Sequence, residues 1–292
     1  MKRSKLISAA IWTLVGIVTL FIARGLWQKG ALVNASSAGN VTAINLHLCL
    51  GADPNTRDEL TNPVLLLAIQ GGHADAAATL IRAGADPNAP DRFGTTPLLA
   101  ALNQTSSKPL FQEIAVKLIA KGADVRARGK SATAVTVALH TPDISMLKLV
   151  LDKGGDPNPA YLGAQIPLSI AVGIRSLERT KLLLDRGANP NYLGEPRLQT
   201  SRSIVMTPLI SAAYSGQTDY VELLLERGAA PNQRMSDGES ALDVVEREMK
   251  WESHRTVPKG QRDPWAGIQR DLPGVVRVLL KHGAKRTTRI GK

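Results

Sequence analysis

Acidic side chains recur at a regular spacing in this chain of 292 residues, and carboxylates in such numbers could bind a metal ion or act in catalysis. They hold the third position of a short string, first written GADPN, in four of its seven copies: Asp53, Asp86, Asp124 and Asp156. A metal needs its oxygen ligands within about 2–2.6 Å of one centre, whereas equivalent residues of stacked helical repeats lie roughly 10 Å apart. The later copies carry other residues there: Asn189, Ala230 and Lys285. We therefore expect the aspartates to form turns.

The remaining candidates for chemistry are weaker. GKS at residues 129–131 resembles the end of a phosphate-binding loop, but that motif requires a glycine where this chain has Asp124. The five histidines are scattered without the spacing of a metal site, and Cys49 is the single cysteine. Neither Gly-x-Ser-x-Gly nor His-Glu-x-x-His occurs. We expect no catalytic residue, metal, cofactor or small-molecule substrate, and hence no enzyme.

The charge of the chain indicates a class of partner. The formal net charge is +11, and five of the 36 basic residues precede residue 30 while all 25 acidic residues follow it, which leaves +6 for the rest. Such a moderate excess suits an acidic protein or anionic lipid, and it gives no reason to expect nucleic acid. Aromatic residues are scarce at 4%, with many Gly and Pro, which favours short helices joined by tight turns.

The copies of the string mark a repeat. Their first glycines stand at residues 51, 84, 122, 154, 187, 228 and 283, so the steps are 33, 38, 32, 33, 41 and 55 residues. In the sixth copy, Thr207 and Pro208 are suited to open a helix as N-cap and first residue. Gly228 is suited to end the following helix in the left-handed conformation, and Pro231 prevents that helix from restarting. Each repeat is therefore predicted to be two helices followed by a projecting loop, or finger.

These strings resemble the ankyrin repeat, whose pattern is a turn, Thr-Pro-Leu-His-x-Ala opening a first helix, a turn with Gly, and a second helix ending at Gly-Ala. DRFGTTPLLAA at 91–101 and TPLISAAYSGQTDYVELLLERG at 207–228 carry the resemblance, although the histidine after Thr-Pro-Leu is absent throughout. It covers residues 28–288 and implies an all-α ankyrin-repeat α-solenoid of about seven repeats, the outer two being caps. The expected repeats are approximately 28–55, 56–88, 89–126, 127–158, 159–191, 192–232 and 233–288.

The N-terminus has the pattern of a membrane element. Residues 6–23, LISAAIWTLVGIVTLFIA, contain no charge and would span about 27 Å as a helix, close to the ~30 Å hydrocarbon core of a bilayer. A basic cluster precedes them and Arg24 follows, so we expect a transmembrane signal-anchor with residues 1–5 in the cytoplasm. The repeats would then lie in the periplasm of a bacterium, at the inner membrane. The alternatives are a signal peptide cleaved near residues 33–35, which releases the repeats into the periplasm, and a cytoplasmic regulator without an anchor.

The fingers carry more basic than acidic residues, with aromatic residues among them. Ankyrin proteins bind partners through the fingers and the concave face of the first helices, so the resemblance implies an acidic protein partner. A solvated face without a partner and contact with anionic lipid headgroups are the alternatives. An insertion at 251–271 contains two tryptophans that suggest docking, or it covers the last repeat. The candidate protein-binding residues are Arg57, Arg92, Phe93, Arg126, Arg128, Lys130, Tyr161, Tyr192, Arg197, Arg202, Arg234, Trp251 and Trp265.

The predicted function is non-catalytic binding of another protein at the outer face of the inner membrane. Two specific roles fit this prediction. One is an immunity protein that neutralises an envelope-acting secreted toxin, and the other is a scaffold for an envelope enzyme complex.

Overall fold

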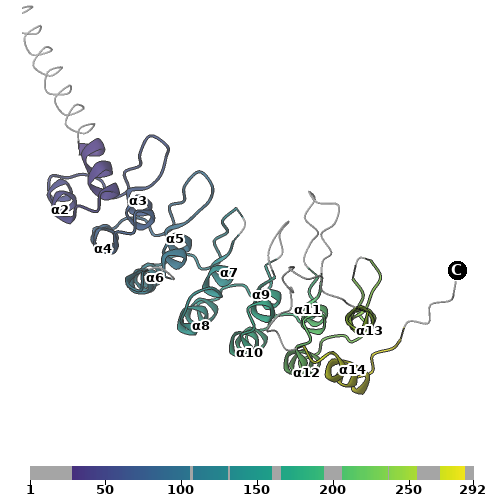
Figure 1. Cartoon of the computed structure of the whole chain (residues 1–292). Helices are drawn as coiled ribbons and strands as arrows, with labels where there is room; N and C mark the ends of the chain where they lie inside the picture. The colour runs from purple at the N-terminus through teal and green to yellow at the C-terminus, as the bar shows by residue number, and fades with distance from the viewer. Residues whose placement is uncertain are drawn as a thin grey trace, which may run out of the picture. The chain divides into compact units, whose positions relative to one another are not determined.

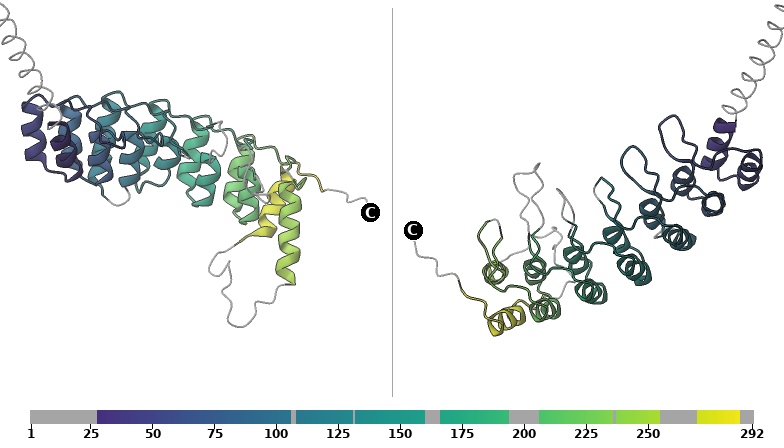
Figure 2. Two further views of the ribbon diagram at one scale, coloured as in Figure 1. Left: turned by 90° about the horizontal axis from the view of Figure 1, so that it is seen from above. Right: turned by 180° about the vertical axis from the view of Figure 1, so that it is seen from behind.

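The computed structural model describes residues 28–105, 108–130, 132–159, 166–193, 206–235, 237–254 and 270–286 (Figure 1 and Figure 2). The chain forms two compact units, residues 1–137 and residues 138–292, and each is described by itself. The predicted membrane segment, residues 6–23, lies outside the described residues. Among the helices within them, none has the length and apolar character needed to cross a bilayer.

The first unit consists of helices that pair in sequence order. Residues 28–37 are helical and precede the rest. The elements that follow are α2 (Val41–Cys49), α3 (Val64–Gln70), α4 (Ala74–Arg82), α5 (Pro97–Gln104), α6 (Leu110–Ala120) and, at the division between the units, α7 (Ala134–Ala138). α3 packs against α4 and α5 against α6, while α3 also contacts α5, and α4 contacts α2 and α6 (Figure 1). First helices therefore form one layer and second helices another, as the repeat predicts.

The second unit repeats this arrangement. Its elements are α8 (Ile144–Asp152), α9 (Pro167–Gly173), α10 (Leu177–Asp185), α11 (Pro208–Tyr214), α12 (Thr218–Glu226), α13 (Ala241–Ser253) and α14 (Leu272–Lys281). α11 lies between α9 and α13 in the layer of first helices, and α12 contacts α14 in the other layer. α13 has 13 residues where α9 and α11 have seven, and it is the long light-green helix in the left view of Figure 2. Its last three residues belong to the segment that the sequence assigned to the 251–271 insertion.

The predicted helix starts are confirmed by their hydrogen bonds. The Thr96 hydroxyl accepts from the backbone N–H of Leu99 at 3.4 Å, and the Thr207 hydroxyl accepts from that of Ile210 at 3.2 Å. Proline follows each threonine at the first helical position, where its missing N–H leaves no bond unmade. α13 begins with a capping box, in which the side chains of Ser240 and Asp243 each accept from the other's backbone N–H.

The repeated string ends one helix and begins a finger, and the aspartates have the predicted role in turns. The first glycine of all seven copies has a φ between 84° and 91°, the left-handed conformation in which a residue without a side chain avoids strain. The carboxylates of Asp53, Asp86, Asp124 and Asp156 each accept the backbone N–H two residues ahead, at 2.8 Å. These bonds tighten the turn into the finger, and each carboxylate serves its own repeat.

The asparagine that closes five of the copies joins its repeat to the following one, a role that sequence reasoning missed. The Asn88 side chain donates to the carbonyl of Gly122 at 2.9 Å and accepts the N–H of Asp124 at 2.7 Å. In the second unit, Asn191 makes the same two bonds to Gly228 and Ala230. Further links of this kind start from Asn55, Asn158 and Asn232. We call these side chains the asparagine ladder.

The helix interfaces are apolar. Leu65, Leu80, Leu98 and Phe111 are at most 1% exposed, and burying side chains of this size stabilises a fold by about 1.5–3 kcal/mol each. Ala101 in α5 is fully buried, as are Ala212 and Ala213 in α11, so the small residues lie where first helices meet their neighbours.

Candidate functional site

An arginine inside the first finger, residues 53–63, holds that finger closed. Arg57 pairs with Pro63 through an isolated antiparallel bridge. Its guanidinium donates to the carbonyl of Thr61 at 2.6 Å and to the carbonyl of Pro90, in the second finger, at 2.9 Å. Charged donors make stronger hydrogen bonds than neutral ones. Arg57 therefore fixes the first finger and ties it to its neighbour, in addition to any contact with a partner.

Two other fingers have arginine at the same position. Arg128 and Arg234 form bridges to Thr133 and Ser240, like that of Arg57. The Arg234 guanidinium also donates to the carbonyl of Gly238 within its finger and lies 3.6 Å from a carboxylate oxygen of Asp243. Sequence reasoning assigned these arginines to partner contacts alone. Their position and bonds show a structural role that the sequence pattern did not reveal.

Apolar side chains project from the tips of the first two fingers. Leu60 and Phe93 both stand nine residues after a helix-ending glycine, and they are 56% and 55% exposed. The Arg92 guanidinium lies over the Phe93 ring at 4.7 Å from its centre, a cation–π contact. The Asp91 carboxylate accepts the N–H groups of Phe93 and Thr95 at 2.8 Å each, which fixes the second tip. We call Leu60 and Phe93 the tip pair; Leu60 was missed as a candidate because it lacks charge and aromatic character.

A hollow of about 620 Å³ adjoins the first tip. Leu60 and Glu59 form its finger side, and Lys29 and Val33 of the helical residues 28–37 form the other. Its lining is mixed in charge and polarity, so it can receive an apolar side chain of a partner beside a polar one. The finger surface of the first unit therefore has two projecting apolar side chains, the tip pair, beside a concave hollow.

The remaining candidate residues are dispersed. Lys130 is exposed in the third finger together with Arg126, whose backbone N–H donates to Asp124. The Tyr192 hydroxyl donates to the carbonyl of Pro159 at 3.3 Å, an internal bond. Trp251 is 47% exposed near the end of α13. Four further candidates lie outside the described residues: Tyr161, Arg197, Arg202 and Trp265.

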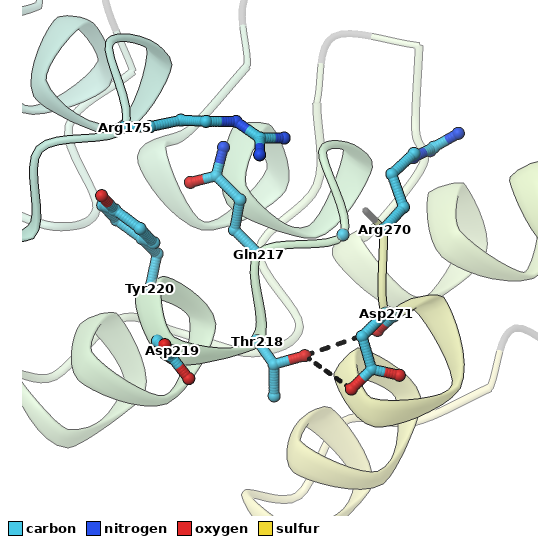
Figure 3. Close-up of a pocket in the computed structure, with 8 residues that line it drawn as sticks. Arg175, Gln217, Thr218, Asp219, Tyr220, Arg270 and Asp271 are labelled. Atoms are coloured by element: carbon cyan, nitrogen blue, oxygen red, sulfur yellow. Dashed lines mark hydrogen bonds between the residues drawn. The ribbon is translucent and has the colours of Figure 1, made fainter. Parts of the chain in front are cut away.

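A second hollow, of about 650 Å³, lies in the second unit at the end of the helices opposite the fingers (Figure 3). Arg175, in the turn before α10, has a φ of 57°, in a turn position that Gly72 and Gly216 fill elsewhere. Gln217, in the turn before α12, is only 9% exposed. Arg270, which precedes α14, forms another wall. In Figure 3, Arg175 and Gln217 extend toward one another across the hollow.

Arg270 attaches the end of the 251–271 insertion to the second unit. Its side chain is 3% exposed, and its guanidinium lies 2.8 Å from the Glu252 carboxylate and 3.4 Å from that of Glu248. It also donates to the carbonyl of Tyr214 and lies over the ring of that residue. Buried charges are retained only when they are paired in this way. Arg270 is therefore a fixed structural wall of the hollow.

The aromatic residue Tyr220 also lines this hollow, and the pKa of its hydroxyl is shifted. Burial raises its pKa above the ordinary value of 10.0, the positive charge of Arg175 opposes the rise, and the negative charge of Asp219 adds to it. The phenol is neutral at physiological pH and keeps its O–H as a hydrogen-bond donor.

Comparison with known proteins agrees with this architecture. The family model for ankyrin repeats in three copies matches residues 32–129, and the single ankyrin-repeat model matches residues 206–236. This chain is an ankyrin-repeat protein. It is 33% identical over 132 residues to a putative ankyrin repeat-containing protein of Treponema pallidum (strain Nichols), and the match covers 45% of this chain and 42% of that protein. The chain thus spans less than half the length of this relative.

Two solved ankyrin domains have the same fold. The ankyrin repeat domain of human ASB11 is 22% identical with a TM-score of 0.59, and the match covers 88% of this chain and 99% of that one. The ankyrin repeat domain of Bcl-3, described as a unique member of the IkappaB protein family, is 26% identical with a TM-score of 0.58; coverage is 86% of this chain and 97% of that one.

Sequence reasoning located the ankyrin fingers and missed the hollow at the opposite edge. A signal was present, because Arg175 replaces the glycine that Gly72 and Gly216 provide in other repeats. A residue with a side chain at a left-handed turn position is unusual enough to be examined. Gln217 gives no such signal, because the burial of its side chain depends on tertiary packing.

Proposed function

We propose that this ankyrin-repeat protein is a non-catalytic binding module whose protein partner docks on the finger surface of the first unit. The tip pair carries the proposal. Leu60 and Phe93 are more than half exposed at equivalent positions of two fingers, and Arg57 donates one hydrogen bond within the first finger and one to the second. Exposed apolar side chains on a rigid support bind with little loss of conformational freedom, which is how interface anchors act.

The partner's surface is proposed to be acidic around an apolar centre. Arg92 stacks on Phe93 and Lys130 is exposed on the third finger, so positive charge lies on the Phe93 side of the tip pair, whereas Glu59 adjoins Leu60. Charges at the rim of an interface mainly raise the association rate and select the partner. Binding should therefore slow as ionic strength rises, while the apolar anchors keep the dissociation rate low.

The test is capture of a partner by the full chain as bait, followed by measurement of its affinity. The double variant Leu60→Ser/Phe93→Ser should lose at least about tenfold in affinity, since central apolar anchors commonly contribute that much each. The matched control is Leu46→Ser/Leu110→Ser, which removes two equally exposed apolar side chains (57% and 60%) of the same unit outside the fingers. Equal loss in both double variants, or loss in neither, would contradict the finger-tip assignment.

The location of the protein is a separate proposal that the sequence supports. The apolar segment at residues 6–23, preceded by a basic cluster, favours a single-pass anchor with the repeats in the periplasm. Reporter fusions after residue 50 test it, because an alkaline phosphatase fusion should be active and a cytoplasmic reporter fusion inactive. The opposite pattern would place the repeats in the cytoplasm.

The biological role is proposed to be either immunity to an envelope-acting secreted toxin or scaffolding of an envelope enzyme complex. The +6 charge of the chain after its N-terminal basic cluster suits an acidic toxin. Captured partners distinguish the two roles: a toxin whose activity the repeats inhibit supports immunity, whereas a resident envelope enzyme supports scaffolding. Robust turnover by the purified chain in a hydrolase screen would refute the non-catalytic assignment.

A further inference from the structure

The hollow at the helix-turn edge of the second unit contains polar groups that the fold leaves unused. The Gln217 side chain is nine-tenths buried, and its oxygen has no hydrogen-bond partner among the described residues. No bond to its nitrogen is found in that part of the chain either. A buried amide without partners costs stability. In Figure 3 this carboxamide points into the space beneath Arg175, where a ligand group would meet it.

Arg175 supplies the positive charge. It is exposed, and the one hydrogen bond of its guanidinium within the described stretches is a long one, 3.5 Å to the carbonyl of Ser215. Most of its five N–H donors are therefore available, and a guanidinium binds a carboxylate through two parallel bonds. Its left-handed backbone is also less stable with a side chain than with glycine.

The start of α12 adds neutral donors. Gln217 is the N-cap of this nine-residue helix, yet its side chain makes no capping bond. The N–H groups of Thr218 and Asp219 have no acceptor among the described residues, and such groups at a helix start attract anions. Tyr220, whose phenol pKa is raised by burial, lines the same hollow.

We infer that this hollow binds the carboxylate of a polypeptide, between the Arg175 guanidinium and the Gln217 carboxamide. Gln217, as a buried amide without a partner, and Arg175, as a left-handed residue with a side chain, each lower the stability of the fold, and both line this hollow. Residues that lower stability are expected at binding sites, where a ligand satisfies their polar groups. The site is independent of the finger-tip proposal, because its residues belong to the second unit and to the other end of the helices.

The surrounding charges favour a carboxylate over a phosphate. Asp219 and Asp271 also line the hollow. The Asp271 carboxylate already accepts from the Thr218 hydroxyl at 3.2 Å and from the Gly274 N–H at 2.8 Å, and that of Asp219 points away from Arg175 in Figure 3. Because like charges repel, a doubly charged phosphate is disfavoured more strongly than a singly charged carboxylate. Arg270 cannot compensate, since Glu248 and Glu252 bind it.

The test uses the full chain with 15N in the side chains of glutamine, observed by two-dimensional NMR. Loss of a signal pair in Gln217→Leu assigns the Gln217 carboxamide. Four probes are titrated: acetyl-Gly-Glu-Gly-amide, acetyl-Gly-Gly-Gly with a free C-terminus, the uncharged acetyl-Gly-Gln-Gly-amide, and inorganic phosphate. The Gln217 signals should shift saturably with at least one of the two carboxylate peptides. The carboxylate peptide that binds more tightly shows whether the bound carboxylate comes from an acidic side chain or from a chain terminus.

Substitutions test the assigned residues. Arg175→Gln should weaken carboxylate binding at least about tenfold, the loss expected for a charged hydrogen-bond donor, and Arg175→Lys should fall between it and the wild type. Arg277→Gln, which removes an exposed charge from α14, is the matched control and should leave binding unchanged. An equal response to the uncharged peptide, tighter binding of phosphate, or unchanged affinity in a correctly melting Arg175→Gln would overturn the inference.

Discussion

Replacing one residue of the asparagine ladder should loosen the joint between two repeats. The Asn88 side chain makes two bonds to the next repeat, to the Gly122 carbonyl at 2.9 Å and from the Asp124 N–H at 2.7 Å. A typical intramolecular hydrogen bond contributes about 0.5–1.5 kcal/mol net, and these lie at the surface. Asn88→Ala should therefore lower the free energy of unfolding of the first unit by about 1–2 kcal/mol.

Two measurements on the full chain check this value. Urea denaturation gives the overall loss, and hydrogen exchange with mass spectrometry locates it, because the Asp124 amide should exchange faster once its acceptor is gone. Asn88→Asp keeps the acceptor and removes the donor, so it should protect Asp124 while still lowering stability.

Asn103→Ala is the control for the ladder. This asparagine is also exposed in the first unit, and it makes no hydrogen bond to the described residues through its side chain. Its replacement should change the free energy of unfolding by less than about 0.5 kcal/mol. If Asn88→Ala and Asn103→Ala have the same effect, or if Asp124 exchange is unchanged in Asn88→Ala, the ladder does not join the repeats energetically.

Three further predictions concern single positions. Gly84→Ala should lower the free energy of unfolding by about 1–2 kcal/mol, because the φ of Gly84 is +90°. A Cβ at this position would meet nothing within 4 Å, so the loss would come from backbone strain alone. The control is Gly173→Ala, where φ is not positive, and it should not lower the melting temperature. Arg270→Met should lower the free energy of unfolding by about 3 kcal/mol, because the Glu248 carboxylate, whose side chain is only 12% exposed, would keep the more distant Arg247 at 3.7 Å as its one remaining cation among the described residues. Thermal melting measures this loss. Burial raises the pKa of Tyr220, so its contribution to stability is intact below pH 10 and is lost as pH rises through the folded-state value. The urea midpoint of the wild type should therefore fall between pH 8 and pH 11, and Tyr220→Phe should remove the part of this fall that comes from Tyr220. If the midpoint of Tyr220→Phe falls with pH as steeply as that of the wild type, the assignment is wrong.

Local chemistry made the repeat predictable. Thr96 and Thr207 as caps, the left-handed glycines and the aspartate turns depend on neighbours within a few residues, so a single repeat contains all the information. The string GADPN was correctly interpreted as a helix end and the start of a finger. Its final asparagine was not understood, because the acceptor and donor that it binds lie in the following repeat, 29 to 53 residues away.

The candidate site was less predictable for the same reason. The basic character of the fingers could be predicted from their composition. Whether an arginine side chain extends into solvent or binds its own finger depends on where the backbone carbonyls point, and Arg57 and Arg234 donate to carbonyls of their own fingers. Leu60 was overlooked because leucine is usually buried. The extent of α13 was underestimated, since the residues after the expected helix end, up to Ser253, form helix as readily as loop.

The ladder explains why the third letter of the string could change so freely. Each asparagine side chain accepts a main-chain N–H of the next repeat, and that N–H belongs to aspartate at residue 124, to asparagine at 189, to alanine at 230 and to lysine at 285. Because the donor is a backbone group, the bond does not depend on the side chain of the donating residue. Only proline, which has no N–H, would remove this donor. Repeats joined by such a universal connector can be duplicated, deleted or exchanged without a matching change in the neighbour, and their exposed residues are left open to diversification.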